Sequence, residues 1–333
     1  LGENRKALEY YEQALPIRKA VGDRRGEATT LNNIGGVYSV LGENRKALEY
    51  LEQALPIFKA VGDRRGEART LTNIGAVYSY LGENRKALEY YEQALPICRA
   101  VGDRGGEAIT LLNMAVALRD TERPGPAVVL LKLAVNRYQS LRRDIAELPA
   151  ETREAYRKKV EPTYRDLADL LIAQGRLPEA QQVMELLKDE ELYQFVRRRA
   201  EVAGQGGQAA MTRTEEDWSA RYERIADEVG VVGSRYGLLL QKERSGQATE
   251  EEKRQLGELA KDLEAVQRRF SAFLSDAARE FAGIDSKGRV LEETRNTQAL
   301  RAKLREVSSK TGLRTVALYT LVAEDRLHVI LIT

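Results

Sequence analysis

A segment of the chain recurs three times almost unchanged, and this repeat constrains the fold more than any other feature. The sequence LGENRKALEYYEQALPI begins at Leu1, returns with one difference at Leu41, and returns again at Leu81, which sets a period of 40 residues. A fixed period of about this length is typical of solenoids, in which each unit buries its apolar face only against its neighbours. The sequence therefore predicts a stack of repeats that binds a partner along its surface.

Composition limits the classes of partner. The 333 residues are 43% hydrophobic and 31% charged, which is enough to bury a large core in more than one domain. The 53 basic and 51 acidic residues leave a net charge of +2, without the clustered basic face that nucleic-acid binding requires. No apolar run approaches the roughly 20 residues that span a bilayer. We expect no nucleic-acid partner, no membrane partner and a cytoplasmic location.

Each repeat is predicted to fold as two helices. In the second unit, apolar residues recur at helical spacing from Ala28 to Tyr38 and again from Ala47 to Phe58. Gly42 is expected to end the first helix, because glycine adopts the left-handed conformation without a steric penalty. Asn44 is expected to cap the second helix.

The spacing of small and aromatic residues within each unit resembles the tetratricopeptide repeat. The second unit matches this pattern at Leu31, Ile34, Gly35, Tyr38, Gly42, Ala47, Leu51 and Ala54, and the third at Leu71, Ile74, Gly75, Tyr78, Gly82, Ala87, Tyr91 and Ala94. Gly35 and Ala47 are expected to let paired helices approach closely, while Tyr38 and Tyr78 fill the space between them. The period exceeds the usual 34 residues and is similar to the extended repeats of kinesin light chains and Pins-type polarity adaptors.

Two further units diverge from the first three. One continues from Leu111 to Ala134, and a last unit spans 164–190 after a helical insertion near 142–160. The repeat solenoid is therefore expected to occupy residues 1–200. Its first unit is incomplete, because the chain opens inside a repeat.

The resemblance implies a partner-binding groove along the concave face of the solenoid, lined by the first helix of each unit. The family position that holds a peptide backbone carries an asparagine in each unit, at Asn33, Asn73 and Asn113. Asparagine suits this role because it both donates and accepts hydrogen bonds. Gly36 and Ala76 are small enough to leave room for a ligand, and Arg69 is placed to meet a carboxylate. The alternatives are that these asparagines only bond backbone at the helix interface and that Arg69 belongs to a solvated face.

The chain changes character after the repeats. Residues 201–213 are rich in glycine and alanine, which indicates a linker. Apolar residues from Trp218 to Leu239 and from Leu256 to Phe273 follow a 3.5-residue period across a short loop at 245–249. These two seams predict an antiparallel helical hairpin over 214–283. Dimerisation between chains is the alternative, but two matched seams joined by a short loop favour pairing within one chain.

The last fifty residues indicate a second architecture. The runs Arg314–Val322 and Arg326–Thr333 are β-rich and predict a β-hairpin. Repeats followed by a helical hairpin and then TVALYTLVAEDRLHVILIT resemble bacterial proteins in which tetratricopeptide repeats precede a CHAT domain. The segment Leu167–Arg198 and the terminal hairpin carry most of this resemblance. The resemblance implies that 284–333 open a caspase-like α/β domain. It also implies a peptidase His–Cys dyad beyond Thr333 in a natural protein that continues past this chain.

No catalytic site is expected within the chain itself. Cys98, the single cysteine, lies in a repeat helix where the sibling units carry Arg18 and Phe58, which indicates packing or partial exposure and not a reactive thiolate. His328, the single histidine, lies in the predicted β-hairpin, so a dyad with Cys98 is not expected. One histidine and one cysteine provide no disulfide and no cysteine-built metal cage. We expect no metal, no cofactor and no small-molecule substrate.

The fold class predicted is mostly α: a tetratricopeptide solenoid, a helical hairpin, and a short β-hairpin that opens an incomplete α/β domain. The function predicted is a protein–protein interaction scaffold that binds a protein or peptide and forms the recognition part of a CHAT cysteine peptidase. The alternative is a stand-alone adaptor with no peptidase activity. Sequence beyond Thr333 discriminates between the two, because only the first requires the dyad there.

Overall fold

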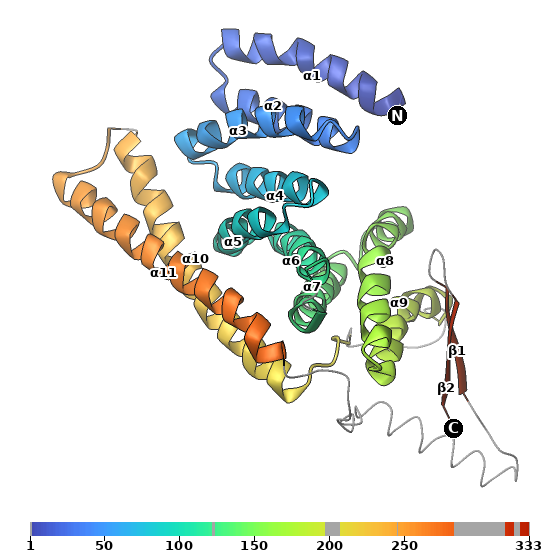
Figure 1. The fold of residues 1–333 in the computed structure, drawn as a ribbon. Coiled ribbons are helices and arrows are strands. Elements are labelled where there is room, and N and C mark those ends of the chain that lie inside the picture. The colour runs from blue at the N-terminus through green and yellow to red at the C-terminus, as the bar shows by residue number, and fades with distance from the viewer. Residues whose placement is uncertain are drawn as a thin grey trace, which may run out of the picture. The chain divides into compact units, whose positions relative to one another are not determined.

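The computed structural model describes residues 2–121, 124–196, 207–244, 246–282, 317–322 and 327–332. These residues are mostly helical, as predicted, and Figure 1 shows the order of the elements. The helices are α1 (Gly2–Ala20), α2 (Arg24–Val40), α3 (Asn44–Val61), α4 (Arg64–Tyr80), α5 (Asn84–Ala100), α6 (Arg104–Arg119), α7 (Pro124–Asp144), α8 (Ala150–Ala173), α9 (Leu177–Val196), α10 (Arg213–Arg244) and α11 (Glu250–Ala282).

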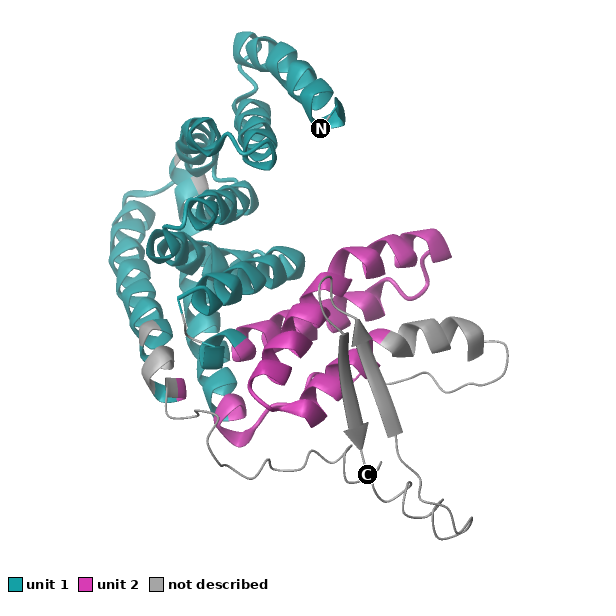
Figure 2. Ribbon diagram, turned by 45° about the vertical axis from the view of Figure 1, so that its right-hand side comes forward, with its two compact units in different colours: residues 1–127, 217–280 teal, residues 128–216, 281–333 magenta. Residues whose placement is uncertain are grey.

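The chain divides into two compact units, drawn in different colours in Figure 2. The first unit contains residues 1–127 and 217–280, and the second contains residues 128–216 and 281–333. Each unit is described by itself below. Among the described residues, no helix combines the length and the apolar character needed to cross a bilayer.

Short polar motifs set the helix boundaries in the first unit. Asp residues precede α2, α4 and α6, and each accepts a hydrogen bond from the backbone N–H three residues on, at 2.8–2.9 Å: Asp23 from Gly26, Asp63 from Gly66, and Asp103 from Gly106. Gly42 has φ of 79°, which confirms its predicted left-handed conformation. The prediction for Asn44 is wrong. It is the first residue of α3, and Glu43 holds the N-cap position without a capping bond.

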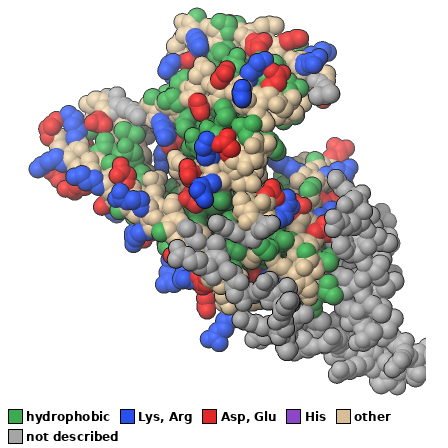
Figure 3. Space-filling view, in the orientation of Figure 1, with side chains coloured by type: hydrophobic (Ala, Val, Ile, Leu, Met, Phe, Trp, Pro, Cys, Tyr) green, Lys and Arg blue, Asp and Glu red, His purple; other side chains and the backbone are tan. Residues whose placement is uncertain are grey.

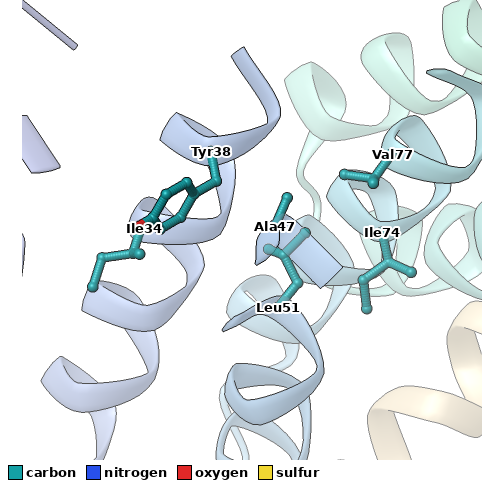
Figure 4. Packing of buried hydrophobic residues seen from close by; sticks show 6 residues of the cluster. All are labelled: Ile34, Tyr38, Ala47, Leu51, Ile74 and Val77. Carbon is teal, nitrogen blue, oxygen red and sulfur yellow. The ribbon is translucent and has the colours of Figure 1, made fainter. Parts of the chain in front are cut away.

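The core of the first unit forms between consecutive helices. Ile34 and Tyr38 of α2 and Ile74 and Val77 of α4 pack on either side of Ala47 and Leu51 of α3 (Figure 4). All six are at most 9% exposed, and burying each of the larger side chains contributes about 1.5–3 kcal/mol. Repeated antiparallel helix pairs, stacked on one another, are therefore confirmed as the basis of this unit.

Glycine makes this packing possible. A Cβ atom added to Gly35 would lie 2.6 Å from Leu51 Cγ and 3.0 Å from the carbonyl oxygen of Ala47. The predicted close approach at Gly35 and Ala47 is thus confirmed. Tyr38 is buried as predicted, but Tyr78 is only half-buried, with its ring stacked on that of Tyr90 at 5.4 Å.

The helices α10 and α11 run antiparallel. Early residues of α10 contact late residues of α11, with Trp218 stacked on Phe273 at 4.9 Å. At the other end, Lys242 and Glu252 form an ion pair at 2.6 Å. Trp218 is 1% exposed, and stacked aromatic pairs add about 0.5–1.5 kcal/mol beyond the area they bury.

A charged and aromatic cluster joins α10 to the repeats of the first unit. The hydroxyl of Tyr222, on α10, donates a hydrogen bond to Glu107 of α6 at 3.2 Å, and both side chains are buried. Arg99 of α5 lies over the Tyr222 ring, 5.4 Å from its centroid, and pairs with Asp227 at 2.9 Å and with Glu223. Arg99 therefore holds α10 against α5 by both charge and ring contact.

The second unit contains most of α7, together with α8 and α9. Residues 142–160, where the sequence predicts an insertion of helical character, contain the end of α7, the turn at 145–149 and the first turns of α8. The two helices are simply longer than in the earlier repeats. The hydroxyl of Tyr156 donates to the carbonyl of Tyr138 at 3.0 Å, which ties these extensions together.

Two short strands, β1 (Ala317–Val322) and β2 (Leu327–Ile332), pair antiparallel, with Ala317 opposite Ile332 and Val322 opposite Leu327. Three segments lie outside the described residues: the residues between the two strands, residues 284–316, and residues 201–206 of the predicted linker. The side chains of both strands, His328 included, also lie outside the described residues. An α/β domain that opens at residue 284 stays a prediction.

Adjacent glycines in α2 test the helix-packing argument. Gly35→Ala is expected to destabilise the chain by about 1–3 kcal/mol, because the added methyl group overlaps Leu51 and approaches the α3 backbone. Gly36→Ala, the matched control, meets no atom within 4 Å and is expected to stabilise by about 0.5–1 kcal/mol through helix propensity. Urea unfolding followed by circular dichroism measures both. Equal stability of the two variants contradicts the packing described here.

Candidate partner-binding surface

The first helices of successive repeats lie beside one another, which places residues one period apart in a row. Helix α2 contacts α4, and α4 contacts α6. The predicted site residues all lie on these three helices, and we call the surface they form the first-helix row. It consists of Asn33, Gly36, Arg69, Asn73, Ala76 and Asn113.

Asn32, next to a predicted site residue, is the centre of a hydrogen-bond network across α2 and α4. Its Oδ1 atom accepts from Thr70 Oγ1 at 3.0 Å and from Asn73 Nδ2 at 3.1 Å. Its Nδ2 atom donates to Asn33 Oδ1 at 3.5 Å. Asn32 is 3% exposed, so this network satisfies a buried amide. Two of the three predicted asparagines therefore meet through a residue that sequence reasoning missed.

The polar contacts continue from α4 to α6 through a different pair. The hydroxyl groups of Thr72 and Thr110 lie 3.0 Å apart, and both side chains are buried. Asn113 is half-buried and, among the described residues, takes no part in these contacts. Along the row, the Asn73 amide is hydrogen-bonded at 3.1 Å and the Asn33 amide only at 3.5 Å. The Asn113 amide has no hydrogen bond to any described residue.

Each amide keeps some capacity for a partner. An asparagine side chain has two N–H donors and an oxygen with two lone pairs. Asn73 uses one donor and Asn33 one acceptor in the network around Asn32. Asn73 therefore bonds a side chain of the neighbouring first helix through one donor, and its oxygen has no hydrogen-bond partner among the described residues.

The other predicted residues leave the row open. A Cβ atom added to Gly36 would meet no atom within 4 Å, and Ala76 is half-buried. Arg69 is exposed and forms no ion pair with any described residue. On the face drawn in Figure 3, basic and acidic side chains are interspersed over the described residues. That face therefore shows no large area of a single sign of charge over the described residues.

Ion pairs link neighbouring repeats at the start of the first helices. Arg25 Nε lies 2.6 Å from Asp63 Oδ2, and Arg65 Nε lies 3.6 Å from Asp103 Oδ2. Both arginines are exposed, and exposed pairs contribute only about 0–1 kcal/mol each. These pairs align the repeats more than they stabilise them.

Cys98 is packed, as the sequence predicts, and its chemistry is suppressed. Its side chain is 2% exposed, and a Cβ atom added to Gly106 would lie 3.1 Å from its Sγ atom. Phe58 occupies the matching place against Gly66, which explains how one position accepts such different residues. Burial, and to a lesser degree the charge of Asp103, raises the pKa of the Cys98 thiol to about 12. A thiol with this pKa is a poor nucleophile at neutral pH.

The described residues contain no group of three His, Cys, Asp or Glu side chains placed to hold a metal ion. The chemistry visible on the first-helix row is hydrogen bonding by amides, with one exposed guanidinium. Such groups bind and orient a polar chain.

Residues 1–60 and 62–140 match the tetratricopeptide repeat family. This part of the chain therefore consists of tetratricopeptide repeats, as the sequence predicts, and such repeats suggest a scaffold for protein–protein interaction. No curated protein matches the sequence. A similar solved structure is the crystal structure of BtubC (BKLC) from P. vanneervenii, at 16% identity and a TM-score of 0.41, covering 88% of this chain and 94% of that one. A likeness at this level supports no conclusion about function.

The burial of Cys98 predicts an inert thiol. With a pKa of about 12, only about one thiol in ten thousand is ionised at pH 8, against about a quarter for an ordinary cysteine. Alkylation by iodoacetamide is expected to be at least about 100-fold slower in the folded chain than in urea, which is the control. Mass spectrometry measures both rates. Equal rates contradict the burial, and peptide cleavage that disappears in Cys98→Ala contradicts the absence of a nucleophile.

Proposed function

We propose that the chain is a protein–protein interaction scaffold whose first-helix row holds an extended segment of a protein partner. The observation that carries the proposal is the set of amides at one position of successive repeats, with unused hydrogen-bonding groups at Asn33, Asn73 and Asn113. An extended peptide exposes a backbone donor or acceptor on each side at regular intervals. Amides repeated along a solenoid match such a ligand without requiring particular side chains from it.

The neighbours of the asparagines support the same ligand. Gly36 and Ala76 have no long side chain to fill the row, and Gly36 is surrounded by open space. Arg69 is exposed and suits a carboxylate of the ligand, from an acidic residue or a chain terminus. The proposed partner is therefore a protein or peptide, and we propose no nucleic acid, membrane, cofactor or small-molecule substrate.

We further propose a place for this scaffold in a larger protein. The resemblance to CHAT proteins supports a layout of repeats over 1–200, a linker at 201–213, a helical hairpin over 214–283 and the start of an α/β domain at 284–333. In this layout the repeats select the partner for a cytoplasmic, bacterial cysteine peptidase, and this chain itself is not the catalyst. The other candidate, a stand-alone adaptor, predicts no histidine and cysteine on successive strand ends downstream of Thr333.

The first step of the test is to identify the partner. The photoreactive residue p-benzoylphenylalanine is introduced at Ala76, in the first-helix row, and separately at Ala60, which is exposed on the second helix α3. Cross-linking in native lysate, followed by mass spectrometry, is expected to recover a partner segment at Ala76 that is absent at Ala60. The same partner at both positions contradicts a site on the first-helix row.

The second step measures the asparagines. Asn33→Ala with Asn113→Ala removes two amides and keeps Asn73, whose bond to the buried Asn32 at 3.1 Å is shorter than that of Asn33 at 3.5 Å. Two hydrogen bonds of about 0.5–1.5 kcal/mol each predict binding weaker by about 5- to 150-fold. Isothermal titration calorimetry with the identified segment measures this change.

The matched control for this variant is Gln53→Ala with Gln93→Ala. These exposed amides are one repeat apart, lie on second helices and bond their own helix backbone. Their removal is expected to leave the affinity unchanged. An Asn33 and Asn113 variant that stays folded and binds with unaltered affinity contradicts the proposed role of these residues.

A further inference from the structure

An extended stretch of the chain lies along two helices of the second unit and is held by its backbone. Residues 207–212 have no regular secondary structure. The backbone N–H of Ala209 donates to Asn136 Oδ1, on α7, at 2.8 Å. The next N–H, of Ala210, donates to Gln182 Oε1, on α9, at 2.9 Å. Amide side chains from two helices thus bind consecutive peptide groups of one segment.

Small residues of this segment lie closest to the helices. Ala209 is 3% exposed, and a Cβ atom added to Gly207 would lie 2.7 Å from Leu186 Cδ2. Gln182 also donates from Nε2 to the carbonyl of Gln208 at 3.3 Å, so its amide bonds the segment with both of its ends. A donor and an acceptor on one side chain fix the register of an extended backbone.

A buried carboxylate anchors the end of the segment. Glu215 is 1% exposed and accepts from Lys132 Nζ at 2.7 Å and from an Arg176 guanidinium nitrogen at 2.8 Å. Glu179 pairs with the same two cations. Although burial opposes its ionisation, Lys132 and Arg176 bring the pKa of Glu215 below its ordinary value.

Charge counting shows which partner this cluster requires. Lys132 lies on α7, Arg176 is the residue before α9 and Glu179 lies on α9, and together they carry a net charge of +1. Lys132 is fully buried, and an uncompensated buried charge is strongly unfavourable. The carboxylate of Glu215 completes the cluster. The surface made by Asn136, Gln182 and these three charges, here called the α7–α9 site, therefore fits an extended peptide that ends in an acid.

We propose that the α7–α9 site is a second peptide-binding site of this protein, separate from the first-helix row, and that residues 207–215 are its ligand in cis. The ligand class is an extended peptide with small residues at the places of Gly207 and Ala209 and a glutamate at the place of Glu215. A segment of another protein with this pattern competes for the same contacts.

Displacement of the cis segment has a structural consequence at the start of α10. Thr212 and Glu215 form a capping box: the N–H of Thr212 donates to Glu215 Oε2 at 2.8 Å, and the N–H of Glu215 meets Thr212 Oγ1 at 3.4 Å. The carboxylate that fills the cluster also caps the helix. A competing peptide therefore removes the anchor of the first turn of α10.

The chain contains a matched control for this double role. At the start of α11, Thr249 and Glu252 form the same capping box, at 2.9 Å and 3.2 Å, and Glu252 also has a lysine partner, Lys242, at 2.6 Å. That box is on the surface and touches no buried cluster. Glu252→Gln therefore alters a capping box and a lysine pair, and Glu215→Gln in addition disturbs the α7–α9 site.

Hydrogen exchange of the full chain tests the cis interaction. In Glu215→Gln, the amides of Ala209 and Ala210 are expected to exchange at least about 10-fold faster, and in Glu252→Gln at the wild-type rate. If Glu215→Gln unfolds α7 and α9, the variant Gln182→Ala is used in its place. In that variant the amide of Ala210 is expected to exchange faster, while the amides of α7 and α8 exchange at the wild-type rate. Wild-type exchange of Ala210 in Gln182→Ala overturns the proposal.

A peptide added in trans tests the site itself. The labelled peptide GQAAMTRTEED, residues 207–217, is titrated into folded Glu215→Gln chain and followed by fluorescence anisotropy. Saturable binding of this peptide is expected. A peptide with glutamine at the place of Glu215 is expected to bind the same chain at least about 10-fold more weakly. The original peptide is also expected to bind the wild-type chain more weakly, because the cis segment competes there. Absence of saturable binding, or equal binding of the two peptides, overturns the proposal and leaves residues 207–215 a purely structural segment.

Discussion

Close contact between consecutive helices is the constraint on which the repeats depend. Gly35 and Gly75 each lie against a side chain of the following helix, Leu51 and Tyr91, with no space for a Cβ atom. A single methyl group at this point moves one helix away from the next, and each repeat buries its apolar face only against its neighbours. The row of first helices, and the amides on it, keep their spacing only while these contacts are maintained.

The forty-residue period also repeats the contacts between units. Asn32 with Thr70, Thr72 with Thr110, and Arg25 with Asp63 are each separated by 38 residues. One geometric step therefore joins a residue of one repeat to the residue that lies two positions before its equivalent in the next repeat, whether the pair is a buried hydrogen bond or an exposed ion pair. The full period of 40 residues separates Asn33, Asn73 and Asn113, which lie on α2, α4 and α6.

Periodic and local features of the sequence predicted the repeats well. Apolar spacing located the helices of residues 1–120, and Gly42 adopts the conformation that its role at a helix end requires. Contacts between distant side chains were not predictable in this way. Asn32 looks like an ordinary helix residue, and only its sibling Thr72 hints that this position is polar. The pairing of Lys132 with Glu215 links residues 83 apart, and charged residues are usually solvated.

The second unit shows that amides of this protein bind an extended backbone. Asn136 and Gln182 accept from consecutive N–H groups of residues 207–212, and Gln182 donates to a carbonyl there. This is the chemistry proposed for Asn33 and Asn113 on the first-helix row. The difference lies in the anchor: the α7–α9 site adds a buried cluster that requires a carboxylate, whereas the row offers the exposed Arg69. A buried charge discriminates against an uncharged ligand more strongly than a solvated charge does. The α7–α9 site is therefore the more selective of the two.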